Sequence, residues 1–490
     1  MITVDWQWIS NLFLYNEESP LLYHSGFFLF IFSLFLVFYG LVLRKDWLRS
    51  ALLILFGFYI YYKASGVFLV LLIATISGDY YFAKWITNSQ TKIRKKALLV
   101  TSILFSLSFL MYFKYKNFFL ENINAIVGSE YSLEKLILPI GISFYTFQSI
   151  SFIVDIYSNK IVLPKYRDYL LYMTFFPHLV AGPIVRARDF MPQLKSYVKI
   201  TVSDIKEATY LIIKGFVKKA IIGDFVAQYS DLIFDDPKLY SSAEQLVGML
   251  CYTLQIFCDF SGYTDMAIGI ALLLGYRLCA NFDSPYKSLN ITQFWRKWHI
   301  SLSSWLRDYI YIPLGGNRRG LLLQLLFLLI TMLVGGFWHG ANWKFVFWGA
   351  GHGLLLIAHK MIAIYWKDNY YASTRIFKFL SWFLTFSVVS LLWVPFRASS
   401  LDDALFIYTS LFSGIDLKMI YGLMQANEEL VVFIALGFAF TGLNAAMKER
   451  MKKWFVRQDF IVITIIFIVL IQVMFQYQAA TVEPFIYFQF

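Results

Sequence analysis

A few histidines carry the side chains best suited to chemistry in this sequence. The chain holds six histidines among 490 residues, and His339 ends a run of eighteen uncharged residues, 321–338, within the segment GGFWHGANW at 335–343. A neutral imidazole accepts a proton near pH 7, and apolar surroundings keep it neutral. The adjacent glycines allow a helix or a substrate to come close, while Trp338 and Trp343 would form a wall for an apolar chain. These residues predict a general base, and a packed histidine bonded to a carbonyl is the alternative.

Other catalytic chemistries lack the spacing that they require. His352 and His359 stand seven residues apart, about 10 Å along a helix, whereas helical metal ligands stand three or four residues apart. No carboxylate stands at a useful spacing beside His339, and no GxSxG segment occurs. We therefore predict no metal site and no bound cofactor. The cysteines form no CxxC pair and are expected to be buried thiols: Cys251, Cys258 and Cys279.

Four further ionisable side chains interrupt apolar segments, where such groups are costly and often functional. Asp155 ends one apolar segment, Asp259 and Asp265 flank a Phe-Ser-Gly-Tyr turn, and His178 lies in a segment with two prolines. They are the remaining candidates for a functional role.

One region, 281–320, is rich in Trp, Arg, Asn and Pro and is not apolar enough to span a membrane. Within it, 294–311 is predicted to form an amphipathic helix, whose polar stripe at 100° per residue holds Arg296, His299, Ser303 and Arg307. Such a helix should lie at the interface or re-enter the protein, with its polar stripe turned to a wet cavity. An ordinary surface helix with extended arginines is the alternative.

The elements that position these residues are predicted from hydropathy. Hydrophobic residues make up 59% of the chain and charged residues 15%, against about 25% charged residues in soluble domains, and the mean hydropathy is +0.60. The apolar runs are continuous, which favours helices over the alternating strands of a barrel. We predict an all-α polytopic transmembrane bundle of about eleven to thirteen spans with re-entrant or interfacial helices, forming a single domain over 1–490. The predicted spans are 25–43, 48–63, 66–83, 97–113, 136–157, 168–184, 208–229, 244–275, 321–338, 344–365, 377–396, 430–447 and 460–477.

The distribution of charge predicts the orientation in the membrane. Residues 1–24 hold three acidic residues and no Lys or Arg, so they are no secretory signal and are expected to be an extracytoplasmic N-terminal segment. The basic segments 84–96 and 448–457 should face the cytoplasm, and the last span leaves the C-terminus outside. The net charge of +12 is then mostly a topology signal. A nucleic-acid surface is the disfavoured alternative, because the basic clusters flank spans.

Several segments resemble one known family. Residues 338–343 (WHGANW), followed by FWG at 347–349 and HG at 352–353, resemble the signature of the membrane-bound O-acyltransferase superfamily. The remaining blocks are similar to its bacterial alginate O-acetylase branch, and the D-alanyl transferase of teichoic acids shares several of them. Residues 1–130 match only in hydropathy. In chain order, the blocks are LPIGISFYTFQ at 138–148, PHLVAGP at 177–183, DFSGYTDMA at 259–267, NFDSPY at 281–286, FWRKWH at 294–299, RDY at 307–309, PLGGN at 313–317 and PFIYFQF at 484–490.

The resemblance implies a fold, an activity and a place in the cell. The fold would be a ring of tilted helices around a central tunnel. The activity would be O-acyl transfer, moving an acetyl group from a cytoplasmic thioester donor (acetyl-CoA, another acyl-CoA or a carrier thioester) for O-acetylation of a cell-surface polysaccharide such as alginate. The protein would lie in the bacterial cytoplasmic (inner) membrane with both termini extracytoplasmic.

The resemblance also implies roles for particular residues. His339 would be the family's essential histidine and would take the proton from an acceptor hydroxyl, and His299 would hold the donor or polarise its carbonyl. The expected substrate-binding residues are Arg296, Ser303, Arg307, Trp338, Asn342 and Trp343. The cations that would receive the phosphates of a coenzyme-A-like donor, or would simply anchor the topology, are Arg296, Lys297, Arg318 and Arg319. A separate extracytoplasmic acetyltransferase of the SGNH type is the expected partner.

Three other functions stay open at the level of sequence. D-alanyl transfer to a teichoic-acid-like polymer would use the same site. A lipid-linked sugar flippase or transporter would share the hydropathy, but it should show internal repeats, and we find none. A non-catalytic scaffold for polysaccharide export would not need either histidine.

Overall fold

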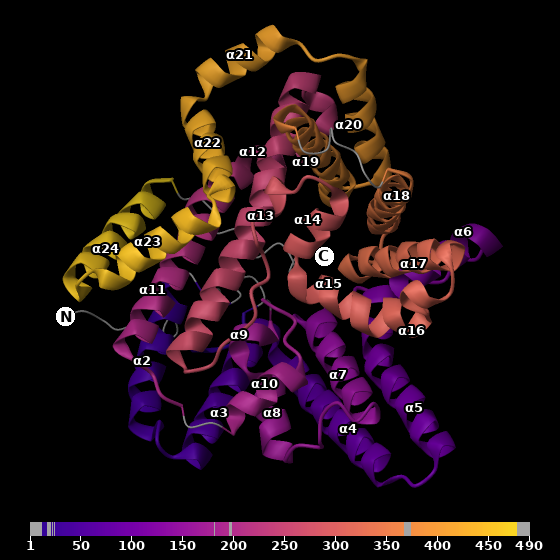
Figure 1. The fold of residues 1–490 in the computed structure, drawn as a ribbon, viewed down its shortest axis with the longest axis vertical. Coiled ribbons are helices and arrows are strands. Elements are labelled where there is room, and N and C mark those ends of the chain that lie inside the picture. Colours follow the sequence, from indigo (N-terminus) through magenta and orange to yellow (C-terminus); the bar gives the residue numbers. More distant parts are fainter. Residues whose placement is uncertain are drawn as a thin grey trace. The chain divides into compact units, whose positions relative to one another are not determined.

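The computed structural model of the chain is built from helices (Figure 1). It describes residues 12–477 with gaps at 17–20, 22, 24, 181, 196–197 and 367–373, and no strand occurs within those ranges. The all-α prediction is therefore confirmed. Most of the predicted extracytoplasmic segment 1–24, and all of the 484–490 block, lie outside the described residues.

The chain divides into two compact units, which are taken separately. Unit 1 comprises 1–205 and 270–279. A buried carboxylate joins three of its helices, since Asp79 accepts hydrogen bonds from Ser106 Oγ at 2.9 Å and from Tyr169 OH at 3.3 Å. The helices of unit 1 are α2 (Gly26–Val42), α3 (Asp46–Ser65), α4 (Leu69–Asn88), α5 (Lys92–Leu110), α6 (Lys116–Val127), α7 (Ile142–Tyr157), α8 (Tyr166–Thr174), α9 (Phe176–Leu179) and α10 (Ala187–Leu194).

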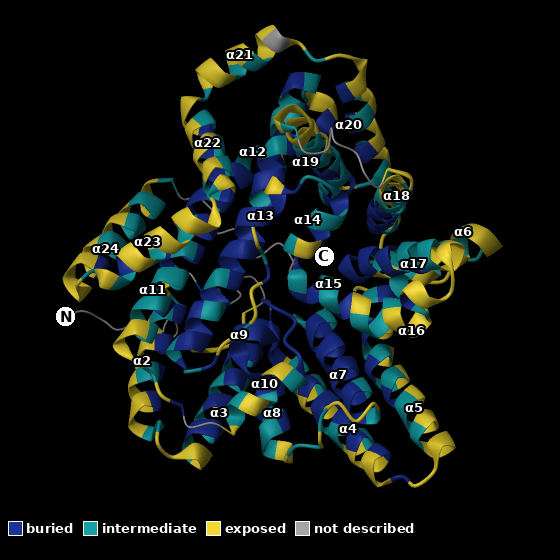
Figure 2. Ribbon diagram, in the orientation of Figure 1, coloured by how far each residue is buried: buried dark blue, intermediate teal, exposed yellow. Residues whose placement is uncertain are grey.

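Unit 2 comprises 206–269 and 280–490 and holds both predicted catalytic histidines. Figure 2 shows α13 largely buried and α24 largely exposed. In its apolar window α13 is 83% buried, against 6% for α24, so α24 leaves most of its apolar surface exposed, as a helix that contacts lipid would. The helices of this unit are α11 (Val202–Phe216), η3 (Val217–Gly223), α12 (Asp224–Asp235), α13 (Ser242–Leu273), α14 (Ile291–Lys297), α15 (Ile300–Leu306), η6 (Arg307–Tyr311), α16 (Ile312–Leu314), α17 (Leu321–His339), α18 (Trp343–Tyr365), α19 (Arg375–Arg397), α20 (Leu401–Ser413), α21 (Leu417–Ala426), α22 (Glu428–Gly442), α23 (Ala445–Arg457) and α24 (Phe460–Tyr477).

Seven helical segments of the described chain are long and apolar enough to cross a membrane, and a bent pair, α21 and α22, would make an eighth. The number is lower than hydropathy predicts, because several predicted spans are interrupted. The predicted span 168–184 breaks at Phe175, two residues before Pro177, and 208–229 passes from α11 into the π-helix η3. A ring with a central tunnel stays a prediction. The seven segments are Asp46–Asn88, Lys92–Val127, Ser242–Leu273, Leu321–His339, Trp343–Tyr365, Arg375–Arg397 and Phe460–Tyr477.

A tight pair of helices, α17 and α18, positions His339. A Cβ atom on Gly336 would lie 2.3 Å from the carbonyl oxygen of Phe345, and one on Gly349 would lie 2.5 Å from that of Met332. Only glycine fits at these two places, so the helices pack backbone against backbone. His339 is the last residue of α17, directly before the turn into α18.

The predicted amphipathic helix 294–311 is wrong as a continuous element. Helix α14 ends at Lys297 and α15 begins at Ile300, and His299 between them has φ +42°. The backbone N–H of Ile300 donates to the carbonyl of Asn281 at 2.9 Å. This bond to a distant segment helps to hold His299 in a left-handed turn. The periodicity of apolar residues along the sequence cannot predict such a turn.

Candidate active site

His339 lies in an aromatic box at the end of α17. Its side chain is buried, and the centroid of its ring lies 5.0 Å from Trp338, 5.0 Å from Trp348 and 5.1 Å from Phe396. The box therefore draws on α17, α18 and α19. An imidazole in such a box is a candidate general base.

His299 is held by its own set of polar contacts. Its ring is fully buried, and Nδ1 lies 3.2 Å from Asn281 Oδ1. That oxygen also accepts hydrogen bonds from the backbone N–H and the hydroxyl of Ser301, at 3.1 and 2.9 Å. A backbone N–H can only donate, so the Asn281 atom is the carbonyl oxygen, and His299 carries its proton on Nδ1. The Nε2 atom then carries the lone pair and can accept a hydrogen bond.

Burial determines the charge of His299. Desolvation lowers the pKa of His299 to about 3, because the charged ring has lost its water. The imidazole is therefore neutral at physiological pH. On its other side, the ring meets the edge of Phe260 at 4.6 Å.

Trp338 brings the two predicted catalytic histidines together. Its indole ring lies 5.0 Å from the ring of His339 and 6.2 Å from that of His299. Trp338 itself is 3% exposed. Two buried imidazoles thus flank one buried indole, an arrangement that could bind an apolar acyl chain and move a proton.

The other predicted substrate-binding residues lie elsewhere. Arg296, Ser303 and Arg307 line a separate cavity of about 390 Å³, which neither His299 nor His339 lines. The side chain of Asn342 caps α18 by accepting a hydrogen bond from Lys344 N at 3.0 Å. Trp343 is 57% exposed, so it does not join Trp338 in one buried wall. The predicted phosphate cations Arg318 and Arg319 are exposed, and Lys297 is half-buried.

His352 extends the aromatic box, a role that the sequence analysis missed. Its Nδ1 accepts a hydrogen bond from Trp295 Nε1 at 3.3 Å, and its ring lies 4.7 Å from Trp348, which also contacts His339. Trp348 and His352 stand four residues apart on α18, which places them on one face. That spacing was the available signal in the sequence for this contact.

The candidate residue His178 belongs to unit 1. It is buried and accepts at Nδ1 from the side-chain amide of Gln148 at 2.8 Å. Phe175, Phe190 and Tyr172 surround its ring at 5.4, 5.5 and 5.7 Å. These contacts are those of a packed, hydrogen-bonded core histidine.

Comparison with known proteins bears on this geometry. Residues 90–394 match the model of the membrane-bound O-acyltransferase family. The chain is 38% identical to the peptidoglycan O-acetyltransferase of Helicobacter pylori over 388 residues, 74% of this chain and 72% of that protein. It is 39% identical to the probable alginate O-acetylase AlgI of Pseudomonas aeruginosa over 417 residues, 83% and 76% of the two chains.

A more distant relative shares part of the chain. The teichoic acid D-alanyltransferase of Bacillus subtilis is 31% identical over 250 residues, 48% of this chain and 62% of that protein. The family match and the apolar helices identify a multi-pass membrane acyltransferase. On this basis, the chain belongs to the membrane-bound O-acyltransferase family.

Proposed function

We propose that this protein transfers acetyl groups for the O-acetylation of a cell-surface polysaccharide. The relatives that cover most of the chain bear the names of peptidoglycan and alginate O-acetylation. The observation that carries the proposal is the convergence of two buried imidazoles, His299 and His339, on the indole of Trp338.

In the proposed reaction, His339 is the general base. It takes the proton of an acceptor hydroxyl while the hydroxyl oxygen attacks the thioester carbonyl. The carbon–sulfur bond then breaks, and His339 returns the proton to the departing thiolate, so the enzyme ends unchanged. A positioned base contributes about 10²- to 10⁴-fold, and holding both substrates in one dry site should contribute at least as much.

The tautomer of His299 refines its part in this reaction. Because Nδ1–H is directed to Asn281, Nε2 can accept a hydrogen bond but cannot donate one to a carbonyl. We therefore assign His299 to orient the acceptor hydroxyl, in place of polarising the donor carbonyl. A neutral ring with a fixed tautomer suits this task.

The donor and the cellular setting belong to the same proposal. The donor is a cytoplasmic thioester such as acetyl-CoA or an acyl carrier, and the protein lies in the cytoplasmic membrane with both termini outside, as the charge distribution favours. An SGNH-type acetyltransferase outside the membrane is the proposed partner, which would complete delivery to the polymer. In that case the hydroxyl at His339 belongs to a relay acceptor.

Mass analysis of surface polysaccharides from cells with and without the protein tests this proposal. An acetyl-sized mass increment that needs the protein, and that His339→Ala fails to restore, is the expected result. Restoration by His339→Ala would favour a scaffold or a flippase, neither of which needs the base.

D-alanyl transfer is the second candidate, favoured by the teichoic acid D-alanyltransferase relative. It predicts an alanyl ester in the same mass analysis. Loss of an alanyl increment, with acetyl unchanged, would replace the first candidate by the second.

A further inference from the structure

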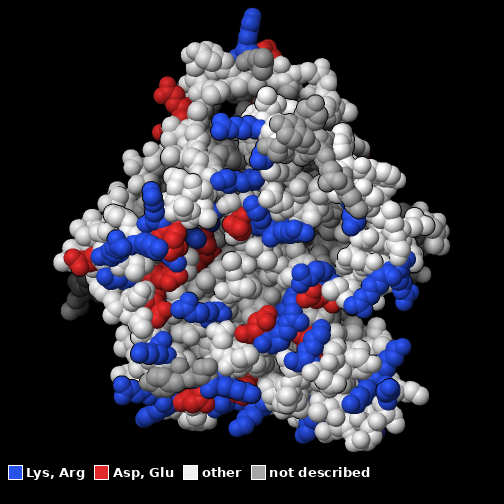
Figure 3. All heavy atoms as spheres, viewed as in Figure 1, with Lys and Arg blue, Asp and Glu red and all other residues white. Residues whose placement is uncertain are grey.

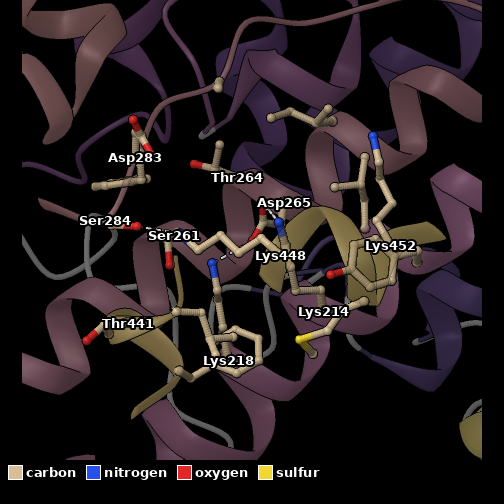
Figure 4. A pocket seen from close by; sticks show the side chains of 18 of the residues that line it. Lys214, Lys218, Ser261, Thr264, Asp265, Asp283, Ser284, Thr441, Lys448 and Lys452 are labelled. Carbon is tan, nitrogen blue, oxygen red and sulfur yellow. Dashed lines mark hydrogen bonds and ion pairs between the residues drawn. The ribbon is translucent and has the colours of Figure 1, made fainter. Parts of the chain in front are cut away.

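A second polar cavity in unit 2 contains neither predicted catalytic histidine. It encloses about 330 Å³, at the lower end of the range of about 300–1,000 Å³ for small-molecule pockets. Its walls come from α11, η3, α13, the segment 280–284, α22 and α23 (Figure 4). We call it the lysine cavity, after four of its lining residues: Lys214, Lys218, Lys448 and Lys452.

Two of these lysines pair with one carboxylate in the inner part of the lysine cavity, and the charges of both act on a third lysine, Lys448. Lys214 Nζ lies 2.8 Å from Asp265 Oδ1, and Lys218 Nζ lies 2.7 Å from Asp265 Oδ2. Lys448 bonds to the hydroxyl of Ser284, and no carboxylate of the described residues lies within ion-pair distance of it. Burial, and then repulsion from Lys218, lowers the pKa of Lys448. The inner wall thus carries two more positive than negative charges.

The other carboxylates of the lysine cavity sit toward its rim. Lys452 Nζ lies 3.4 Å from both Glu207 and Glu449, so this group of three carries one net negative charge. Asp283 is exposed. Figure 3 shows acidic and basic side chains mixed over α11 and α23, the outer face of this region. Four lysines and four carboxylates line the cavity as a whole, so the excess of positive charge is confined to its inner wall.

Buried hydroxyl and amide groups line the same cavity without a partner. Ser261 Oγ, Thr264 Oγ1 and Asn281 Nδ2 are buried and make no hydrogen bond within the described part of the chain. Leaving such a group unsatisfied destabilises a protein, so three of them around one cavity favour a ligand that bonds to them. Ser261 and Thr264 stand on α13 beside Asp265, as Figure 4 shows. Phosphate oxygens are bound in proteins by lysine ammonium groups together with neutral hydrogen-bond donors.

The cavity also reaches the candidate active site through Asn281. This residue lines the lysine cavity, and its Oδ1 atom holds His299 Nδ1 at 3.2 Å. A ligand that occupies the cavity would therefore touch the residue that fixes the tautomer of His299.

We propose that the lysine cavity binds the phosphate groups of a phosphate-bearing ligand, with Lys448, Ser261 and Thr264 as donors. Assigning that ligand as the acyl donor rests on the proposed function, whereas the phosphate site does not. Coenzyme A and an anionic phospholipid headgroup carry the same chemistry. In the predicted topology α23 faces the cytoplasm, where a nucleotide thioester would arrive.

Equilibrium binding of radiolabelled coenzyme A to the purified full chain tests the proposal. Lys448→Met should weaken binding about 10-fold or more, since it removes a charged donor. Lys453→Met is the matched control: Lys453 stands on the same helix, is 64% exposed and does not line the cavity. It should change binding less than about 2-fold, because exposed charges contribute little.

Ser261→Ala separates a ligand site from a structural one. Removing a hydroxyl that has no partner should not lower the melting temperature, yet it should weaken coenzyme A binding several-fold. A fall in melting temperature with unchanged binding would count against the site.

Two further measurements complete the test. One distinguishes a lipid phosphate from that of coenzyme A, and the other separates phosphate binding from catalysis. Binding of phosphatidylglycerol in nanodiscs that is lost in Lys448→Met, with no coenzyme A binding, supports a phosphate site for a lipid. His339→Ala should bind as the unmodified protein does while transferring no acetyl, so a failed mechanism leaves the site standing. No binding of either probe, or equal losses in Lys448→Met and Lys453→Met, overturns the proposal.

Discussion

Two histidines with different surroundings define the candidate site at the scale of residues. His339 sits among aromatic rings, whereas His299 is fixed by Asn281 and Ser301. The sequence predicted both as candidates, from the apolar run before His339 and from the family blocks. It could not predict that they share Trp338, because the left-handed turn at His299 depends on hydrogen bonds from a segment eighteen residues away. The unpartnered hydroxyls of the lysine cavity could not be predicted either, because they too depend on contacts between distant segments.

Asn281→Asp tests the arrangement around His299 through pH. A carboxylate beside Nδ1 favours the protonated ring, so it should raise the pKa of His299 from about 3 toward the physiological range. Protonation removes the lone pair on Nε2, and activity should then fall as pH decreases through the raised pKa. The acid limb of the pH–rate profile should move to higher pH, with activity at alkaline pH retained.

Asn290→Asp is the control for that experiment. Asn290 caps α14 by accepting from Gln293 N at 2.8 Å, and Asp is an equally good N-cap. Its acid limb should stay where it is. An unmoved acid limb in Asn281→Asp, or the same displacement in both variants, would contradict the role given to Asn281.

At the scale of elements, hydropathy identified apolar helices well and interruptions poorly. The spans 321–338, 344–365 and 377–396 correspond closely to α17, α18 and α19. The stretch 294–311 does not form one helix, since tertiary bonds to Asn281 outweigh its periodicity. Lys214 and Lys218, four residues apart inside a predicted span, were an available sign of a polar interior opposite Asp265.

The α17–α18 pair gives a prediction at this scale. Gly336→Ala places a Cβ atom 2.3 Å from a backbone oxygen, so the two helices must separate, and we expect a loss of about 1–3 kcal/mol in unfolding free energy. His339 would move with the end of α17, so acyl transfer should fall too. Thermal melting in detergent and an activity assay measure the two effects.

A matched glycine makes this test specific. Gly40 lies inside α2, is exposed, and has no atom within 4 Å of an added Cβ. Gly40→Ala should therefore raise stability by roughly 0.5–1 kcal/mol through helix propensity. Equal melting temperatures for the two variants would rule out close packing as the role of Gly336.

At the scale of the whole molecule, the strongest inference from sequence was the family. Its blocks run in order along the chain, and the family model covers 90–394. Composition alone supports a multi-pass membrane protein, which the apolar helices confirm. Composition cannot name an acyl group or an acceptor, because such specificity depends on a few side chains of a binding site.

The central claim is that His339 is the base for acyl transfer, and reconstituted activity tests it most directly. Purified protein in liposomes would be given radiolabelled acetyl-CoA and a hydroxyl acceptor, and acetyl ester formation would be followed. We expect His339→Ala to reduce the rate by about 10²- to 10⁴-fold in protein that still folds. A folded His339→Ala protein that forms acetyl ester at the rate of the unmodified protein would contradict the account.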